Sequence, residues 1–269
     1  MSGSLLSTAI PASIQPVIDD YLGLITTRLP DFLTGFYLHG SLALGAFNPH
    51  FSDIDFVSVV SRRCTASDVS ELRVIHEALA QRYPRWPLEG SYLQWDDLGQ
   101  SEATILAHPH IHDGMVHPSG YHDINAVTWS LLKHRGIAIL GPAPDQLDIQ
   151  VDWDDLIAKM HHNMNSYWVR FTTNPRRMAW LLSDYGVQWA VLGVLRQFYT
   201  FREHDITSKT GAGIYAFRHT PRHWHQLIQE ALSIRAGTHT SAYRFRIVRA
   251  IATRAFLRYI IDLCNADMV

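Results

Sequence analysis

Cysteine is nearly absent from this 269-residue chain. The two cysteines, Cys64 and Cys264, lie far apart in the sequence and form no CxxC pair. A disulfide framework or a thiolate zinc site is therefore not expected. Long apolar runs are missing as well, because none approaches the roughly 20 residues that a membrane-spanning helix needs. We expect no membrane partner.

The N-terminus lacks the features of a secretory leader. Residues 1–15 contain no Lys or Arg, and Pro11 interrupts their short apolar run. This pattern does not read as a signal peptide, which begins with a basic region. We therefore expect a soluble protein of the cytoplasm.

Net charge is also small, with 23 Lys and Arg against 25 Asp and Glu. The total excludes neither nucleic acid nor small anions as ligands. The distribution is more informative: residues 1–150 carry 8 basic and 16 acidic side chains, and residues 151–269 carry 15 and 9. Two readings stay open, namely two solvated surfaces of opposite sign, or an acidic region for a metal and a basic region for phosphates.

Hydrophobic residues make up 47% of the chain, which suits a globular protein with a real core. The apolar periodicity and the turn residues predict an ordered series of elements. Strands are expected at 35–39, 54–60, 87–94 and 137–140. Helices are expected at 13–30, 66–82 (capped by Ser67), 123–135, 152–172, 185–203, 221–234 and 240–264, and an irregular segment at 96–120.

The order of these elements predicts the fold class and the domains. All expected strands precede the segment from Gly141 to Asp148, which is rich in Pro and Asp, and only helices follow it. We therefore expect an α+β fold. A mixed sheet with helices would occupy residues 1–147, and an all-α helical bundle would occupy residues 148–269.

The strongest local signal combines Gly40-Ser41 with an Asp-x-Asp pair at Asp53 and Asp55. Side chains at i and i+2 of a strand point to the same side, so the two carboxylates should face one way, with Ile54 buried behind them. Paired carboxylates together with substrate phosphates suit Mg²⁺. Gly allows close backbone approach to a phosphate, and the neighbouring hydroxyl can donate a hydrogen bond. Asp-x-Asp on a solvated strand edge and Gly-Ser in a turn are each common, but this combination indicates a polyphosphate site.

The stretch GSLALGAFNPHFSDIDF, residues 40–56, resembles the signature of the nucleotidyltransferase superfamily that includes DNA polymerase β. Most of the chain is similar to the aminoglycoside adenylyltransferases that act on streptomycin and spectinomycin. The similarity includes Pro87-Leu88-Glu89, Asp123-Ile124-Asn125-Ala126, Leu140-Gly141-Pro142-Ala143 and the helix around Arg196. It implies an N-terminal nucleotidyltransferase domain and a C-terminal domain that holds substrate and nucleotide.

The resemblance also implies roles for single residues. It implies that Asp53 and Asp55 bind Mg²⁺ and that Gly40, Ser41 and Ser52 hold the triphosphate of ATP. It places Glu89 where the family has the general base that takes the proton from the acceptor hydroxyl. A role for Glu89 as a third metal ligand stays open.

The basic half should supply cations for the nucleotide. Arg196 interrupts an apolar helix, and a buried Arg is usually paired or functional. Lys209 follows thirteen residues later, after the expected end of that helix. The adenylyltransferases have the same spacing, which implies that both residues contact phosphates. The structural alternatives are an ordinary salt bridge for Arg196 and an exposed loop for Lys209.

Two further clusters are weaker signals. Five histidines crowd into the irregular segment, namely His108, His110, His112, His117 and His122. A transition-metal site is conceivable, but the spacing matches no standard ligand frame, so a loop on the substrate side is favoured. Several arginines lie on the last expected helix, and a solvated helix face is more ordinary for them than a nucleic-acid contact; they are Arg244, Arg246, Arg249, Arg254 and Arg258.

The acceptor is the least constrained part of the reading. Acidic residues such as Asp113 would attract a cationic amino sugar, and Trp180 and Asp184 are further candidates, although Arg176 and Arg177 beside them would repel it. The function implied is the Mg²⁺-dependent transfer of AMP from ATP to a hydroxyl of an aminoglycoside-type antibiotic, with release of pyrophosphate. The protein is expected to be a monomer without nucleic acid. A different metabolite, protein or RNA acceptor, or a non-catalytic nucleotide-binding regulator, remain alternatives.

Overall fold

The computed structural model describes residues 10–238 and 240–266, and the chain forms two compact units, residues 1–151 and 152–269. The sequence prediction put this boundary at 147/148. The expectation about a signal peptide falls mostly on residues 1–9, which lie outside the described part. Within the described ranges, no helix is both long and apolar enough to cross a membrane.

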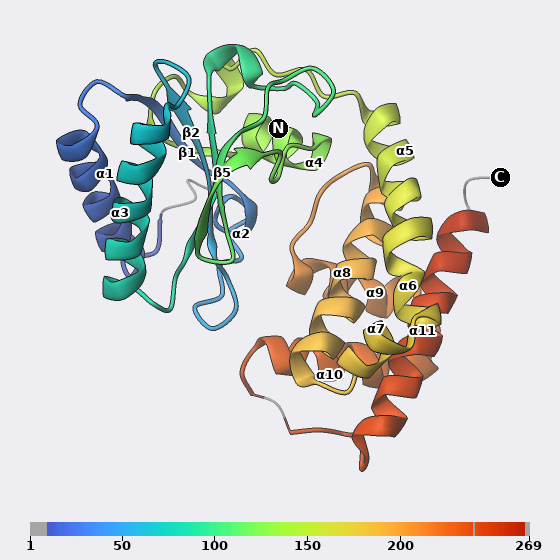
Figure 1. The fold of residues 1–269 in the computed structure, drawn as a ribbon. Coiled ribbons are helices and arrows are strands. Elements are labelled where there is room, and N and C mark those ends of the chain that lie inside the picture. Colours follow the sequence, from blue (N-terminus) through green and yellow to red (C-terminus); the bar gives the residue numbers. More distant parts are fainter. Residues whose placement is uncertain (1–9, 239, 267–269) are drawn as a thin grey trace, which may run out of the picture. The chain divides into compact units, whose positions relative to one another are not determined.

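The N-terminal unit is a six-stranded mixed sheet with helices on its faces (Figure 1). The strand order is β5-β4-β3-β2-β1-β6, in which only β2 and β3 are parallel neighbours. Its elements are α1 (Gln15–Arg28), β1 (Leu33–Leu38), α2 (Gly40–Ala43), β2 (Ile54–Val60), α3 (Ala66–Arg82), β3 (Leu88–Leu93), η1 (Trp95–Asp97), β4 (His108–His112), β5 (Met115–Gly120), α4 (Ala126–Arg135), β6 (Ile137–Leu140) and η2 (Pro144–Gln146).

Strand β2 shows how the sheet separates two cores. Ile54 and Phe56 belong to the hydrophobic cluster that α1 and α3 cover. Val57 and Val59 belong to a second cluster that includes Trp129 of α4. Since neighbouring residues of a strand face opposite ways, Asp55 lies on the same side as Val57 and Val59, the α4 side. The expected burial of Ile54 behind the Asp pair is confirmed, because its side chain is fully buried.

The irregular segment expected at 96–120 is a wrong prediction. Residues 108–120 form the hairpin of β4 and β5, and β4 also pairs with β3. The two turn residues, Asp113 and Gly114, have φ of +49° and +70°. Two consecutive positive φ values fit the two-residue hairpin turns that Asp-Gly favours. The prolines and glycines of this segment, which include Pro109 and Pro118, favoured a loop in the sequence prediction.

The cap of α3 also differs from the prediction. Thr65, and not Ser67, is the N-cap, because its hydroxyl accepts a hydrogen bond from the backbone N–H of Asp68. The Asp68 carboxylate in turn accepts one from the N–H of Thr65, which completes a capping box. Arg62 pairs with Asp68 and holds the pKa of that carboxyl well below its usual range.

The C-terminal unit is all helical, as the fold class predicted. Its long central helix α8 packs against α9, α10 and α11 around one hydrophobic cluster. The elements are α5 (Trp153–Asn163), the π-helical turn η3 (Met164–Trp168), α6 (Arg170–Thr173), α7 (Pro175–Trp180), α8 (Asp184–Glu203), α9 (Lys209–His219), η4 (Arg222–Trp224), α10 (His225–Arg235) and α11 (Arg246–Ala266).

Helix α9 was missed because its glycines interrupt the helical pattern. Gly213 has a packing role, since a Cβ there would lie 2.7 Å from Leu232 and 3.0 Å from Leu192. The start of α9 carries a readable signal, because Ser208 caps it by accepting from the N–H of Gly211. The expected continuous helix at 152–172 is also interrupted, by the π-helical turn η3.

The arginines of the last expected helix fall into two groups: Arg244, Arg246 and Arg258 are exposed, as predicted, whereas Arg249 is buried and Arg254 is half-buried. Arg249 is 1% exposed and pairs with Glu230 at 2.9 Å and with Asp184 at 2.5 Å. Arg254 and Arg258 both donate to the backbone carbonyl of Thr172. These three side chains therefore hold α11 against the rest of the unit.

Candidate active site

Strand pairing brings two of the predicted site residues together. In the parallel pair of β2 and β3, Asp55 lies directly opposite Glu89. Residues opposite each other on adjacent strands lie on the same side of a sheet, and neighbouring strands are about 4.8 Å apart. Asp53 comes immediately before β2. The register thus gathers the three predicted carboxylates where the neighbouring strands β2 and β3 begin.

The electrostatics agree with this closeness of the carboxylates. Burial raises the pKa of Asp55 well above its usual range, and the neighbouring charges of Asp53, Asp123 and Glu89 raise it further. The pKa of Glu89 is also raised, first by burial and then by Asp53. Like charges in one site disfavour ionisation unless a cation balances them. Hard oxygen donors in this arrangement fit Mg²⁺.

The turn after β1 packs against this carboxylate group. Gly40 has φ of +56°, and a Cβ added there would lie 1.8 Å from Oδ2 of Asp55. The backbone of Ser41 donates a hydrogen bond to the Asp55 carboxylate, and His39 N–H donates to the Asp55 carbonyl at 3.0 Å. Only glycine has both this φ and this closeness at no steric cost. Gly40 is therefore required by the Asp pair.

Ser41 has a second property that points to a ligand. Its hydroxyl oxygen is buried and has no hydrogen-bond partner among the described residues. Leaving such a group unpaired costs about 1–3 kcal/mol. A phosphate oxygen beside Gly40 would supply the missing partner. Ser52 is also buried, but its hydroxyl already accepts from the N–H of Asn48 at 3.0 Å and thereby closes the turn before Asp53.

Glu89 is held by the β4–β5 hairpin. Its Oε1 accepts a hydrogen bond from the N–H of Asp113 at 3.0 Å, and its Oε2 lies 3.3 Å from Nδ1 of His112. Both contacts lower the pKa of Glu89, but burial and Asp53 outweigh them. A carboxylate with a raised pKa is a stronger base than an ordinary Glu.

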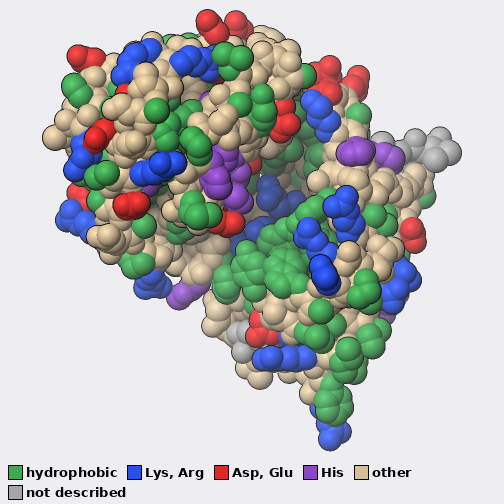
Figure 2. All heavy atoms as spheres, in the orientation of Figure 1, with side chains coloured by type: hydrophobic (Ala, Val, Ile, Leu, Met, Phe, Trp, Pro, Cys, Tyr) green, Lys and Arg blue, Asp and Glu red, His purple; other side chains and the backbone are tan. Residues whose placement is uncertain are grey.

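Four of the five histidines form a stack, to which His110, His112 and His117 come from the hairpin and His122 from the turn after β5. The rings of His112 and His122 have centroids 4.4 Å apart, His122 and His110 follow at 5.5 Å, and His110 and His117 at 4.8 Å. Burial lowers the pKa of His110 and of His122. Figure 2 shows histidine side chains gathered in one patch on the surface of the unit.

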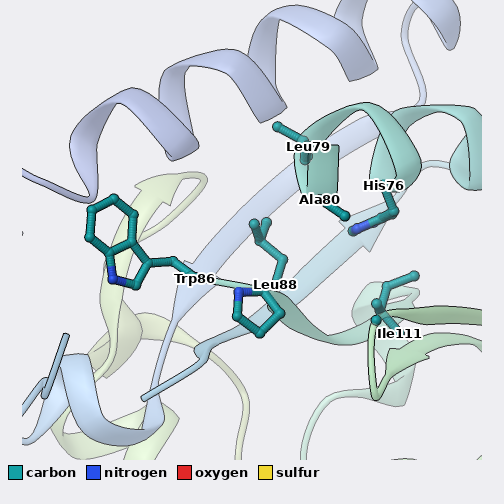
Figure 3. Close-up of a pocket in the computed structure, with 8 residues that line it drawn as sticks. His76, Leu79, Ala80, Trp86, Leu88 and Ile111 are labelled. Atoms are coloured by element: carbon teal, nitrogen blue, oxygen red, sulfur yellow. The ribbon is translucent and has the colours of Figure 1, made fainter. Parts of the chain in front are cut away.

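The cavity below α3 is not a candidate ligand site. His76, Leu79 and Ala80 of α3 line it above Leu88 and Ile111 of the sheet (Figure 3). Its volume of about 20 Å³ is enough for about one water molecule. Neither a nucleotide nor an amino sugar fits into a space of this size.

In the C-terminal unit, Arg196 and Lys209 belong to one local structure. Nε of Arg196, on α8, donates to the carbonyl of Thr207 at 3.2 Å. Lys209 is the first residue of α9, two residues beyond Thr207. The hydrogen bond thus holds the Arg196 guanidinium at the segment from which α9 starts. The exposed-loop alternative for Lys209 is wrong.

The remaining predicted acceptor residues lie in different places. Asp113 is in the hairpin turn, where its N–H binds Glu89. Trp180 ends α7 and lines a hollow of about 390 Å³ together with Asn174, Arg176 and Arg177. Asp184 is in the first turn of α8 and forms the ion pair with Arg249.

Comparison with known protein families gives a match: the family model of the aminoglycoside adenylyltransferase C-terminal domain matches residues 175–257. The match lies within the C-terminal unit. The resemblance to the aminoglycoside adenylyltransferases is therefore confirmed, and with it the class of enzyme, an adenylyltransferase. No curated protein matches the sequence of the chain.

A solved structure shows the same fold over nearly the whole length. It is the spectinomycin adenyltransferase AAD(9) from Enterococcus faecialis, crystallised with ATP and spectinomycin. The two chains share 13% identity and a TM-score of 0.63, and the match covers 91% of this chain and 99% of the other. The predicted α+β fold, with a mixed sheet followed by helices, is confirmed.

Asp123 is a further acidic residue beside this carboxylate group, and the sequence prediction gave it no catalytic role. Its charge raises the pKa of Asp55 and also acts on His39. It has φ of +58° and precedes α4, whose N-cap is Asn125. The sequence showed Asp123 only as part of a family-like stretch and as one of several acidic residues. The tertiary fold was needed to place its charge beside Asp55.

Proposed function

We propose that this protein transfers AMP from ATP to a hydroxyl group of an aminoglycoside-type antibiotic and releases pyrophosphate. The observation that carries the proposal is the register of β2 and β3, which sets Asp55 opposite Glu89, with Gly40 packed against the Asp55 carboxylate. Carboxylates for a metal thereby lie next to a separate carboxylate that can act as a base. The family match and the fold agree with this chemistry.

In this proposal Asp53 and Asp55 hold Mg²⁺, which when bound neutralises charge on the triphosphate. Gly40 gives the phosphates access to the backbone, and the unpartnered hydroxyl of Ser41 donates to a phosphate oxygen. Ser52 keeps the preceding turn closed and provides a further hydroxyl hydrogen. Arg196 and Lys209, which the hydrogen bond to Thr207 brings to one segment, contribute positive charge to the nucleotide phosphates.

Glu89 acts as the general base. The acceptor hydroxyl loses its proton to a carboxylate oxygen of Glu89 while its own oxygen bonds to the α-phosphorus. The bond between that phosphorus and the pyrophosphate oxygen breaks. The raised pKa of Glu89 suits it to take the proton, and the N–H of Asp113 keeps the carboxylate oriented. The alternative role, a third Mg²⁺ ligand, predicts weaker MgATP binding when Glu89 is neutralised.

Each unit contains residues that we propose as acceptor contacts. The acidic group around Glu89, with Asp113 at its edge, would attract the ammonium groups of an amino sugar. We include Trp180 and Asp184 as acceptor contacts of lower rank, because Asp184 already pairs with Arg249. RNA or protein as acceptor is less well supported, since three of the five arginines, Arg249, Arg254 and Arg258, make contacts within their own unit.

The test is pyrophosphate release from MgATP across a panel of aminoglycosides that includes streptomycin and spectinomycin. We expect release with at least one compound, and its loss in Asp53→Asn and Asp55→Asn. Asp19→Asn is the matched control, because Asp19 is an exposed carboxylate that accepts a hydrogen bond from Gln15 in the same helix. Release that persists in both variants would refute the metal assignment. MgATP binding without release for any antibiotic would refute the acceptor class.

The role of Glu89 has its own test. Glu89→Gln should keep MgATP affinity, measured by calorimetry, and lose transfer. A large loss of MgATP affinity in this variant would instead identify Glu89 as a ligand of the magnesium ion.

A further inference from the structure

Three side chains of the hairpin region meet around one point. Glu89 lies on β3, His112 at the end of β4, and His122 just after β5. Each offers one ligand atom, and these atoms all lie within 4.8 Å of one another. Two imidazole nitrogens and one carboxylate form a donor set unlike the all-oxygen set of Asp53 and Asp55. Imidazole suits zinc and related transition metals, whereas magnesium prefers oxygen.

The spacing of these atoms is close to that of a tetrahedral site. Zinc bonds to His nitrogen and carboxylate oxygen at about 2.0–2.2 Å, so adjacent ligand atoms around it are about 3.4 Å apart. Nδ1 of His112 and Oε2 of Glu89 are 3.3 Å apart. The His112 and His122 rings are already stacked, with centroids 4.4 Å apart. The ligand atoms of the group lie within 4.8 Å of one another, so a side-chain adjustment of His122 by up to about 1.4 Å would complete three ligand positions.

Asp113 provides the outer contacts that metal sites need. Oδ2 of Asp113 lies 3.5 Å from Nε2 of His112, the nitrogen opposite the one that faces Glu89. A carboxylate at this position orients the ring and makes the other nitrogen a better ligand. The backbone N–H of Asp113 also holds Oε1 of Glu89, which leaves Oε2 directed at His112. One turn residue thus orients two of the three ligands.

We propose that Glu89, His112 and His122 form a binding site for a zinc-type transition-metal ion, separate from the carboxylates that hold magnesium. The fourth position is open to water. A zinc ion in this site occupies the Oε2 of Glu89, so that this carboxylate no longer accepts a proton. Zinc should consequently inhibit nucleotidyl transfer without displacing MgATP. The inhibition rests on the proposed function, whereas the metal site itself does not.

Metal binding is tested first without any turnover. The purified full-length protein is titrated with Zn²⁺ by calorimetry, and with Co²⁺ by visible absorption, which reports the ligand geometry. We expect one site per chain, with affinity reduced at least about tenfold in His122→Asn and in Asp113→Asn. His117→Asn is the matched control, since His117 belongs to the same histidine stack but not to the three ligands.

The outcomes separate the possibilities. Equal affinity in wild type and His122→Asn would overturn the proposal, as would an equal loss in His117→Asn, which would indicate diffuse binding by the histidine patch. Circular dichroism of each metal-free variant checks that the unit still folds. Zinc inhibition of transfer that His122→Asn relieves supports the functional consequence. Zinc binding in a protein that shows no transfer with any acceptor leaves the metal site standing and refutes only the proposed function.

Discussion

Gly40→Ala is the most direct perturbation of the candidate active site. Gly40 has φ of +56°, where a side chain costs roughly 1–2 kcal/mol. The added Cβ would also lie 1.8 Å from Oδ2 of Asp55. Carbon and oxygen normally approach no closer than about 3.3 Å, so the carboxylate or the turn must move by about 1.5 Å. The backbone strain at residue 40 lowers the stability of the fold, and the displacement of the Asp55 carboxylate disturbs the candidate active site.

The two effects have different expected sizes. A misplacement of about 1 Å in an active site costs roughly 100-fold in rate. We therefore expect kcat for MgATP-dependent pyrophosphate release to fall at least about 100-fold in Gly40→Ala. The backbone strain alone should lower the melting temperature by only about 2–8 °C. The assay is pyrophosphate release with the acceptor that supports turnover, run beside a thermal melt of each protein.

Gly99→Ala separates strain from displacement. Gly99 has φ of +80°, but a Cβ there would meet Ile149 at 3.2 Å instead of a carboxylate. This control should lose stability to a similar extent and keep its activity. Gly40→Ala with turnover within about threefold of the wild type would refute the reasoning that ties Gly40 to Asp55 and Asp55 to catalysis.

Three further predictions concern neighbouring parts of the structure. Asp123→Asn removes a negative charge beside Asp55 and so weakens the attraction of the site for Mg²⁺; transfer at limiting Mg²⁺ should fall at least about tenfold, and unchanged transfer would exclude Asp123 from the site. Burial lowers the pKa of His76 to about 3. Below about pH 6.5 the unfolded chain therefore binds a proton that the folded chain does not, and the free energy of unfolding decreases as the pH falls towards 3. Between pH 7.5 and pH 5 the free energy of unfolding, measured by urea titration, should drop by about 2 kcal/mol from this group; the drop should be smaller by that amount in His76→Gln but not in the exposed control His50→Gln. Arg249→Met leaves the carboxylate of Glu230 buried without its cation and should cost about 3–5 kcal/mol, a loss that Glu230→Gln in the same chain should partly restore; additive losses in the double variant would contradict the pairing.

Local patterns in the sequence predicted much of the fold. Helix α3 and strand β2 have the expected bounds, because apolar periodicity of 3.6 and runs of β-branched residues are local properties. The hairpin of β4 and β5 was missed although its Asp113-Gly114 turn is a local signal as well. Helix α9 was missed because Gly213 reads as a helix breaker, and only the packed side chains of Leu192 and Leu232 show why glycine is required there.

For the candidate site, too, the sequence predicted some features and the tertiary structure was needed for others. Gly40, Ser41, Asp53 and Asp55 all lie within residues 40–55. Their types and spacing are therefore local properties, from which the sequence by itself predicted a polyphosphate site. Glu89 entered only by family resemblance, because nothing near it in the sequence marks it as a base. Its position opposite Asp55 is a property of strand register, which depends on pairing between distant segments.

The sequence alone thus predicted a polyphosphate site and the succession of a sheet unit and a helical unit, because both predictions follow from residue types and short-range periodicity. The tertiary structure decided which charges share a site: it set Asp123 beside Asp55 and gathered His112 and His122 around Glu89. Burial and the proximity of segments that are distant in the sequence control pKa values and metal affinity. Burial and proximity cannot be read from spacing along the chain.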